Sequence, residues 1–79
     1  MIAEQLFQEM HKRHLTTSRR GWSRAWAGMA QNWLCENRAK PLPAEVALTV
    51  HRKLVRIGER ELAAWILNGL VGEDSEVWG

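Results

Sequence analysis

The chain has little cysteine, little proline and no long apolar run, and these shortages exclude several classes of protein. Its single cysteine, Cys35, cannot form an internal disulfide, so we expect a reducing, cytoplasmic compartment. The longest apolar run, residues 62–67, has six residues, where a membrane span needs about twenty. Polar residues also interrupt the sequence after Met1, as they would not in a secretory signal. We therefore expect no membrane partner.

The small size of the chain limits its function. At 79 residues, 46% apolar and 25% charged, it has the composition of one small globular domain. A chain of this size buries only about 60–65% of its unfolded surface, which leaves one thin core and no room for a deep substrate cavity. We therefore expect no enzyme and no cofactor, with one helical domain over residues 1–71 and a flexible acidic tail over residues 72–79.

Charge is divided unevenly along the chain, although the formal net charge is only +2. Residues 1–58 carry ten Lys/Arg against four acids, a balance of +6, and residues 59–79 carry one arginine against five acids, a balance of −4. A basic body attracts a polyanion, whereas an acidic C-terminus keeps the protein soluble or masks the basic surface. An unevenly charged, solvated surface without a partner is the simpler interpretation.

Apolar residues recur at steps of three and four, which predicts helices throughout. The expected segments are residues 2–14, 18–27 after a possible N-cap among residues 16–18, 30–38, about 43–57, and a fifth that ends at Gly69 and Gly72. Gly58 is either a tight connection or a weak point within one longer helix. No strands are expected, so the predicted fold is an all-α bundle of about five helices. Core spacing also predicts that four tryptophans are buried: Trp22, Trp26, Trp33 and Trp65. For Cys35 a small buried thiol is favoured over a nucleophile.

Two short helices over residues 18–38, joined across Ala27-Gly28-Met29, have the layout of a helix-turn-helix. If the second helix buries its apolar face, its other face carries side chains suited to reading base edges. These candidate base-reading residues are Gln31, Asn32, Cys35 and Arg38. The candidate phosphate contacts around them are Arg19, Arg20, Arg24 and Lys40.

The same region resembles a known family. Residues 15–28, with Trp22-Ser23, Trp26 and Gly28, then Asn32-Trp33 and then residues 40–43 ahead of an apolar helix, are similar to an uncharacterised family of small bacterial helix-turn-helix-like proteins. The likeness covers residues 4–57. It implies a helix-turn-helix fold more firmly than any ligand.

We therefore predict a small DNA-binding helix-turn-helix protein, a transcriptional regulator of a mobile element, that forms a homodimer. The dimer contact is expected on the apolar stripe of the last helix: Leu62, Trp65, Ile66 and Leu70. The alternative is a helical protein-binding module that inhibits or caps a partner, as an antiactivator or a phage-type inhibitor would.

A metal site is the weaker interpretation of the histidines. His11 and His14, three apart, would need a third ligand from Cys35 or His51, and the paired ligand motifs of structural zinc sites are missing. No motif supports Cys35 as a nucleophile either. We expect no metal and no catalytic residue.

Overall fold

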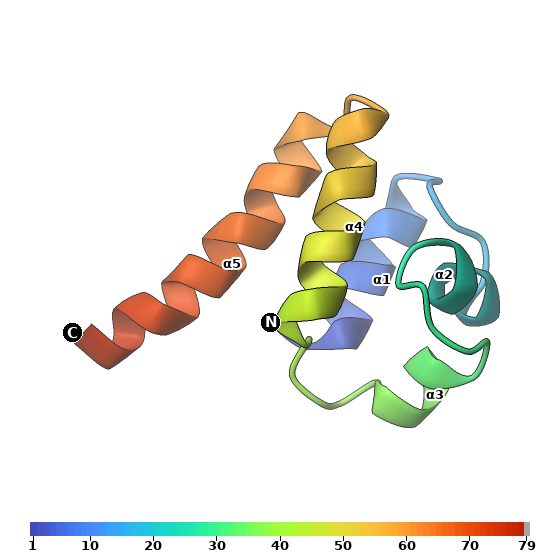
Figure 1. Ribbon diagram of the computed structural model, residues 1–79, viewed down its shortest axis with the longest axis horizontal. Helices are drawn as coiled ribbons and strands as arrows, with labels where there is room; N and C mark the ends of the chain where they lie inside the picture. The colour runs from blue at the N-terminus through green and yellow to red at the C-terminus, as the bar shows by residue number, and fades with distance from the viewer. Residues whose placement is uncertain (79) are drawn as a thin grey trace.

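A computed structural model describes the backbone of residues 1–78 and the side chains of residues 1–69. Figure 1 shows the helices packed into a small bundle, from which the C-terminal half of the last helix extends. The helices are α1 (Ala3–Lys12), α2 (Arg19–Ala25), α3 (Trp33–Asn37), α4 (Ala44–Arg56) and α5 (Arg60–Trp78). No strand forms within residues 1–78, where Ile2 and Pro41 make an isolated bridge. The predicted all-α bundle of five helices is confirmed.

The core combines the apolar stripes of α1, α4 and α5 with Trp22 of α2 and Leu34 of α3. The fully or almost fully buried residues of α1 and α4 have the predicted spacing: Ala3, Leu6, Phe7 and Met10, then Val46, Ala47, Val50 and Leu54. Among the described side chains of α5 the buried ones are Leu62, Ala63 and Ile66. α5 packs beside α4 (Figure 1). Full burial of each Leu, Ile or Val side chain contributes about 1.5–3 kcal/mol, so these stripes are the main source of stability.

The N-terminus of α1 is held by the segment that connects α3 to α4. The N–H groups of Ala3 and Glu4 donate to the carbonyls of Lys40 and Arg38, at 3.3 and 3.4 Å, and the N–H of Leu42 donates to the carbonyl of Met1 at 2.9 Å. Because the first N–H groups of a helix have no partner within it, these bonds satisfy donors that would otherwise need water. The connection thereby fixes α1 against the middle of the chain.

The packing of α3 on α2 depends on one small buried hydroxyl. Ser23 of α2 is fully buried; its Oγ donates to the carbonyl of Arg19 at 2.8 Å and accepts the backbone N–H of Leu34 at 3.1 Å. Ser18 caps the start of α2 by accepting the N–H of Gly21 at 3.0 Å, which selects it from the three predicted cap residues.

Two glycines explain where the chain turns and where it does not. Gly58 has a φ of +87° and separates α4 from α5, so the two segments are not one long helix.

The predicted end of the fifth helix at Gly69 and Gly72 is wrong, because α5 continues to Trp78. A glycine inside a helix costs only about 1 kcal/mol and keeps its N–H, unlike a proline, and no proline follows here. The side chains of the acidic tail lie outside the described residues.

The burial of the tryptophans and the cysteine differs from expectation. Trp22 is fully buried; it meets Phe7 edge-on and its Nε1–H contacts Met10 Sδ at 3.1 Å. Trp26 and Trp33 are half-buried, and Trp65 is 38% exposed because it lies at the edge of the α5 stripe. Cys35 is exposed, so the expectation of a buried thiol is wrong.

Within residues 1–78, no helix has both the length and the apolar content that crossing a membrane requires.

Candidate nucleic-acid interface

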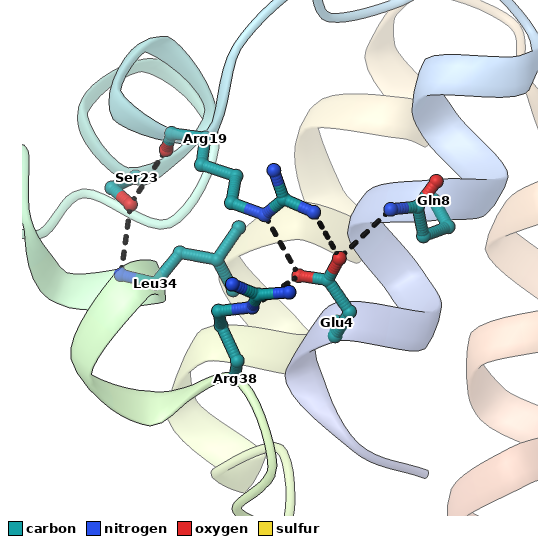
Figure 2. A network of polar contacts seen from close by, with 6 residues as sticks. All are labelled: Glu4, Gln8, Arg19, Ser23, Leu34 and Arg38. Carbon is teal, nitrogen blue, oxygen red and sulfur yellow. Dashed lines mark hydrogen bonds and ion pairs between the residues drawn. The ribbon is translucent and has the colours of Figure 1, made fainter.

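Glu4 of α1 is the centre of a polar network that joins three helices (Figure 2). Arg19 of α2 donates to its carboxylate from Nε at 3.1 Å and from Nη2 at 2.5 Å. Gln8 Nε2 donates to Glu4 Oε2 at 2.8 Å, and Arg38 Nε, at the end of α3, lies 3.6 Å from Glu4 Oε1. The carboxylate therefore links α1 to both helices of the predicted helix-turn-helix.

This network has a clear electrostatic signature. The hydrogen bonds from Arg19 hold the pKa of Glu4 below its ordinary value, with Gln8 and Arg38 adding to the effect and partial burial opposing it. The guanidinium of Arg19 also lies 5.0 Å from the centre of the Phe7 ring, a cation–π contact. Arg19, a candidate phosphate contact, is thus engaged within the protein.

The candidate base-reading residues have different surroundings, although all four are exposed. Gln31 has no hydrogen bond from its side chain to the described part of the chain. Asn32 Nδ2 donates to Glu36 Oε1 at 2.9 Å, and Arg38 is engaged by Glu4. Cys35 is also exposed but has no side-chain amide. Among the four candidates, only Gln31 therefore has a side-chain amide that is free to pair with a base edge.

The two helices of the predicted motif are in contact, but their geometry does not establish a helix-turn-helix. Residues 26–32 separate α2 from α3, whereas such turns have about three or four residues. α3 covers only Trp33–Asn37, shorter than the predicted 30–38, because Ala30 is exposed and Gln31 and Asn32 form a turn. The helical pattern in the sequence therefore overestimated the length of the second helix.

The remaining candidate phosphate contacts are accessible. Arg20, Arg24 and Lys40 are exposed, and none forms an ion pair with the side chains of residues 1–69. Arg20 and Arg24 lie four apart on α2 and therefore on one face of that helix. Their role as phosphate contacts stays a prediction.

Three further cations on α4 were missed by sequence reasoning. Thr49, Arg52, Lys53 and Arg56 line an open hollow of about 220 Å³. Lys53 Nζ donates to the backbone carbonyls of Ala25 and Trp26, at 2.7 and 3.4 Å, at the end of α2. The signal in the sequence is a polar series at steps of three, one and three residues, which places these side chains on one face of α4, away from its apolar stripe.

The acids of the body are engaged mainly around α1. Glu4 is held by Arg19 and Arg38, and Glu9 lies within 3.5 Å of Lys12 and 3.7 Å of Arg13. Six of the ten Lys/Arg of residues 1–58 form no ion pair with the described side chains: Arg20, Arg24, Lys40, Arg52, Lys53 and Arg56. Arginine and lysine donors that lack a carboxylate are available to the oxygens of phosphate groups.

The candidate dimer stripe of α5 is largely used by the protein's own core. Leu62 and Ile66 have no exposed surface, Trp65 is partly exposed, and the side chain of Leu70 lies outside the described residues. The histidines and Cys35 do not come together either: the described side chains include no group of three residues able to hold a metal.

The candidate binding surface consists of the exposed hydrogen-bond donors on α2, α4 and the α3–α4 connection. The exposed amide of Gln31 lies nearby in the sequence. Comparison with protein-family models, with curated proteins and with solved structures gives no match to this chain.

Proposed function

We propose that this protein binds double-stranded DNA as a small transcriptional regulator. The observation that carries the proposal is a surplus of unpaired positive charge: Glu4 and Glu9 are engaged by cations around α1, while six cations on α2, α4 and the α3–α4 connection have no ion-pair partner among the described side chains. DNA presents a dense row of phosphate charges, and each lysine or arginine that neutralises one releases counterions and strengthens binding.

The contacts divide into two kinds. Arg20 and Arg24, on one face of α2, and Lys40, between α3 and α4, contact phosphates and position the protein. Gln31 pairs with a base edge, since glutamine forms two hydrogen bonds with adenine in the major groove. Asn32 and Arg38 are tied to Glu36 and Glu4. Phosphate contacts therefore dominate the affinity, and base contacts contribute less than the sequence suggested.

The test is a fluorescence titration of the full chain with labelled duplex DNA at several salt concentrations. Arg20→Gln and Arg24→Gln should each weaken binding to every sequence and reduce the salt slope by about 0.9. Gln31→Ala should leave the slope unchanged and remove discrimination at one base pair, by about 1–3 kcal/mol.

The matched control is Lys12→Gln, which also removes one exposed cation, but one paired with Glu9 on α1. Its slope should stay close to that of the parent. If the parent binds no duplex, DNA binding is excluded. If it binds with an affinity that does not depend on salt, the proposed phosphate contacts are excluded.

A second candidate function, binding of a protein, is favoured by apolar side chains at the surface. Trp65 and Leu67 of α5 are 38% and 39% exposed, and Leu48 and Val55 of α4 are about half exposed. Exposed tryptophan is frequent at the centre of protein interfaces. Such a surface suits the predicted homodimer or a foreign partner, and in either case Trp65 is the residue to change.

A further inference from the structure

The hollow on α4 is lined by one polar residue and three cations. Thr49, Arg52, Lys53 and Arg56 are spaced so that they lie on one face of the helix, and no carboxylate lines the space of about 220 Å³ between them. Glu45, the acid of this helix, lies in its first turn and outside the lining. The hollow is therefore a concentrated positive site.

Backbone carbonyls hold one of these cations in place. Lys53 Nζ donates to the carbonyls of Ala25 and Trp26, where α2 ends and its backbone carries partial negative charge. This contact fixes α4 against α2 and accounts for Lys53 as a structural residue. It does not account for Arg52 and Arg56, which are exposed and have no ion pair to the described side chains.

The arrangement of the two arginines is unfavourable without an anion. Like charges four residues apart on a helix, as Arg52 and Arg56 are, destabilise it. An anion between them would remove the repulsion and accept hydrogen bonds from both guanidinium groups, whose planar donor sets match the oxygens of a phosphate. The Thr49 hydroxyl, which now donates to the carbonyl of Glu45 at 2.8 Å, lines the same space.

We propose that this hollow binds a phosphate group of the DNA backbone, with Arg52 and Arg56 as its ligands. The inference rests on the proposed function and adds to it a phosphate contact on α4, apart from those of Arg20 and Arg24. Because Arg24 immediately precedes Ala25, the bond from Lys53 places the last turn of α2 beside the hollow. A DNA strand that crosses this junction meets cations from both helices.

The first experiment tests the hollow without DNA. Backbone amide NMR spectra of the full chain are recorded during titration with inorganic pyrophosphate at low salt. Saturable shifts should concentrate at residues 49–56, and the double variant Arg52→Gln/Arg56→Gln should lose affinity at least tenfold. Arg60→Gln, an exposed cation just beyond the turn and outside the hollow, is the control and should bind as the parent does.

The second experiment repeats the DNA titration with the same variants. The double variant should reduce the salt slope by about 0.9, since one phosphate contact is removed, while Arg52→Lys/Arg56→Lys should recover most of the slope because it keeps the charge. Urea unfolding of each variant identifies any that is misfolded. If the double glutamine variant is misfolded, the double lysine variant still tests the site.

The outcomes separate the two proposals. If the parent binds DNA but the double variant has the same slope as Arg60→Gln, the hollow is not a phosphate site, whereas DNA binding stands. If the parent binds no DNA, the proposed function fails, and with it the DNA contact on α4. Equal pyrophosphate affinity of the parent and the double variant overturns the phosphate site whatever DNA does.

Discussion

Arg19 and Glu4 form a two-point contact across fifteen residues of sequence, with donor–acceptor distances of 3.1 and 2.5 Å. The guanidinium also lies over Phe7, so its polar edge and its flat face are both engaged by α1. Arg19, which the sequence suggested as a phosphate contact, thus holds α2 against α1. The carboxylate of Glu4, 18% exposed, is the point at which this contact can be tested.

Glu4→Gln should destabilise the fold by about 1–2 kcal/mol, because Arg19 and Arg38 lose their charged acceptor while part of their attraction is already screened by solvent. Urea unfolding at neutral pH measures the change. Glu45→Gln, an exposed acid with no ion pair to the described residues, should stay within about 0.5 kcal/mol of the parent. Equal effects of the two substitutions would mean that the network adds no stability.

The lowered pKa of Glu4 also predicts how stability depends on pH. A carboxyl whose pKa is lower in the folded protein than in the unfolded chain stabilises the fold fully above the unfolded value, near 4.5. This contribution is lost as the pH falls from there through the lowered folded value. The difference in unfolding free energy between the parent and Glu4→Gln should therefore be constant from pH 7 to about pH 5.5 and shrink at lower pH. A difference that does not shrink would exclude this titration as its source.

Ser23→Ala should cost about 1–3 kcal/mol, because the N–H of Leu34 would be buried without an acceptor. Thr49→Ala is the matched comparison, since both hydroxyls donate to the carbonyl four residues earlier but only Ser23 accepts a bond from another helix. Thermal unfolding should show a loss for the first substitution and almost none for the second. Similar melting temperatures would remove Ser23 as the link between α2 and α3.

The tryptophans should differ in their contribution to stability in the order of their burial. Trp22→Ala should cost about 3–5 kcal/mol, a large part of the stability of so small a domain. Trp26→Ala should cost less, since that side chain is half-buried, and Trp65→Ala least. Circular dichroism during urea unfolding gives the order, and a Trp26 variant as unstable as the Trp22 variant would contradict it.

Self-association is the test for the exposed part of α5. If two copies pair through this helix, Trp65→Glu places a charge in the contact and should yield monomers in sedimentation measurements. The folded monomer should survive, because Leu62 and Ile66 rather than Trp65 fill the core. A parent that is monomeric at high micromolar concentration would exclude the homodimer.

Most of the fold was predictable because α1 and α4 are long amphipathic helices. Leu6 and Met10 of α1, and Val50 and Leu54 of α4, are buried as their spacing predicts. Local spacing was a poorer guide around α3, where a turn at residues 31–32 replaces the expected first helical turn. The spacing also did not show that Trp65 lies at the edge of the buried stripe of α5, because the position of that edge depends on how α4 packs against α5.

The candidate site was less predictable, since its electrostatics depend on distant partners. Nothing in the local pattern indicates that Arg19 pairs with Glu4, or that Lys53 reaches the carbonyl of Ala25, twenty-eight residues earlier. Which cations remain without a partner follows only from the three-dimensional packing. The sequence correctly indicated an excess of positive charge but did not show that Arg19 is engaged by Glu4.

The bonds between the start of α1 and residues 38–42 have a consequence for the order in which the chain folds. α4 and α5 are neighbours in sequence and pair through a tight turn, so their contacts form after closure of a short loop. α1 is made first during synthesis, yet the carbonyls that receive the N–H groups of Ala3 and Glu4 belong to Lys40 and Arg38. We therefore expect α1 to wait, incompletely docked, until the middle of the chain has been made, and its first turn to gain protection from hydrogen exchange only after that.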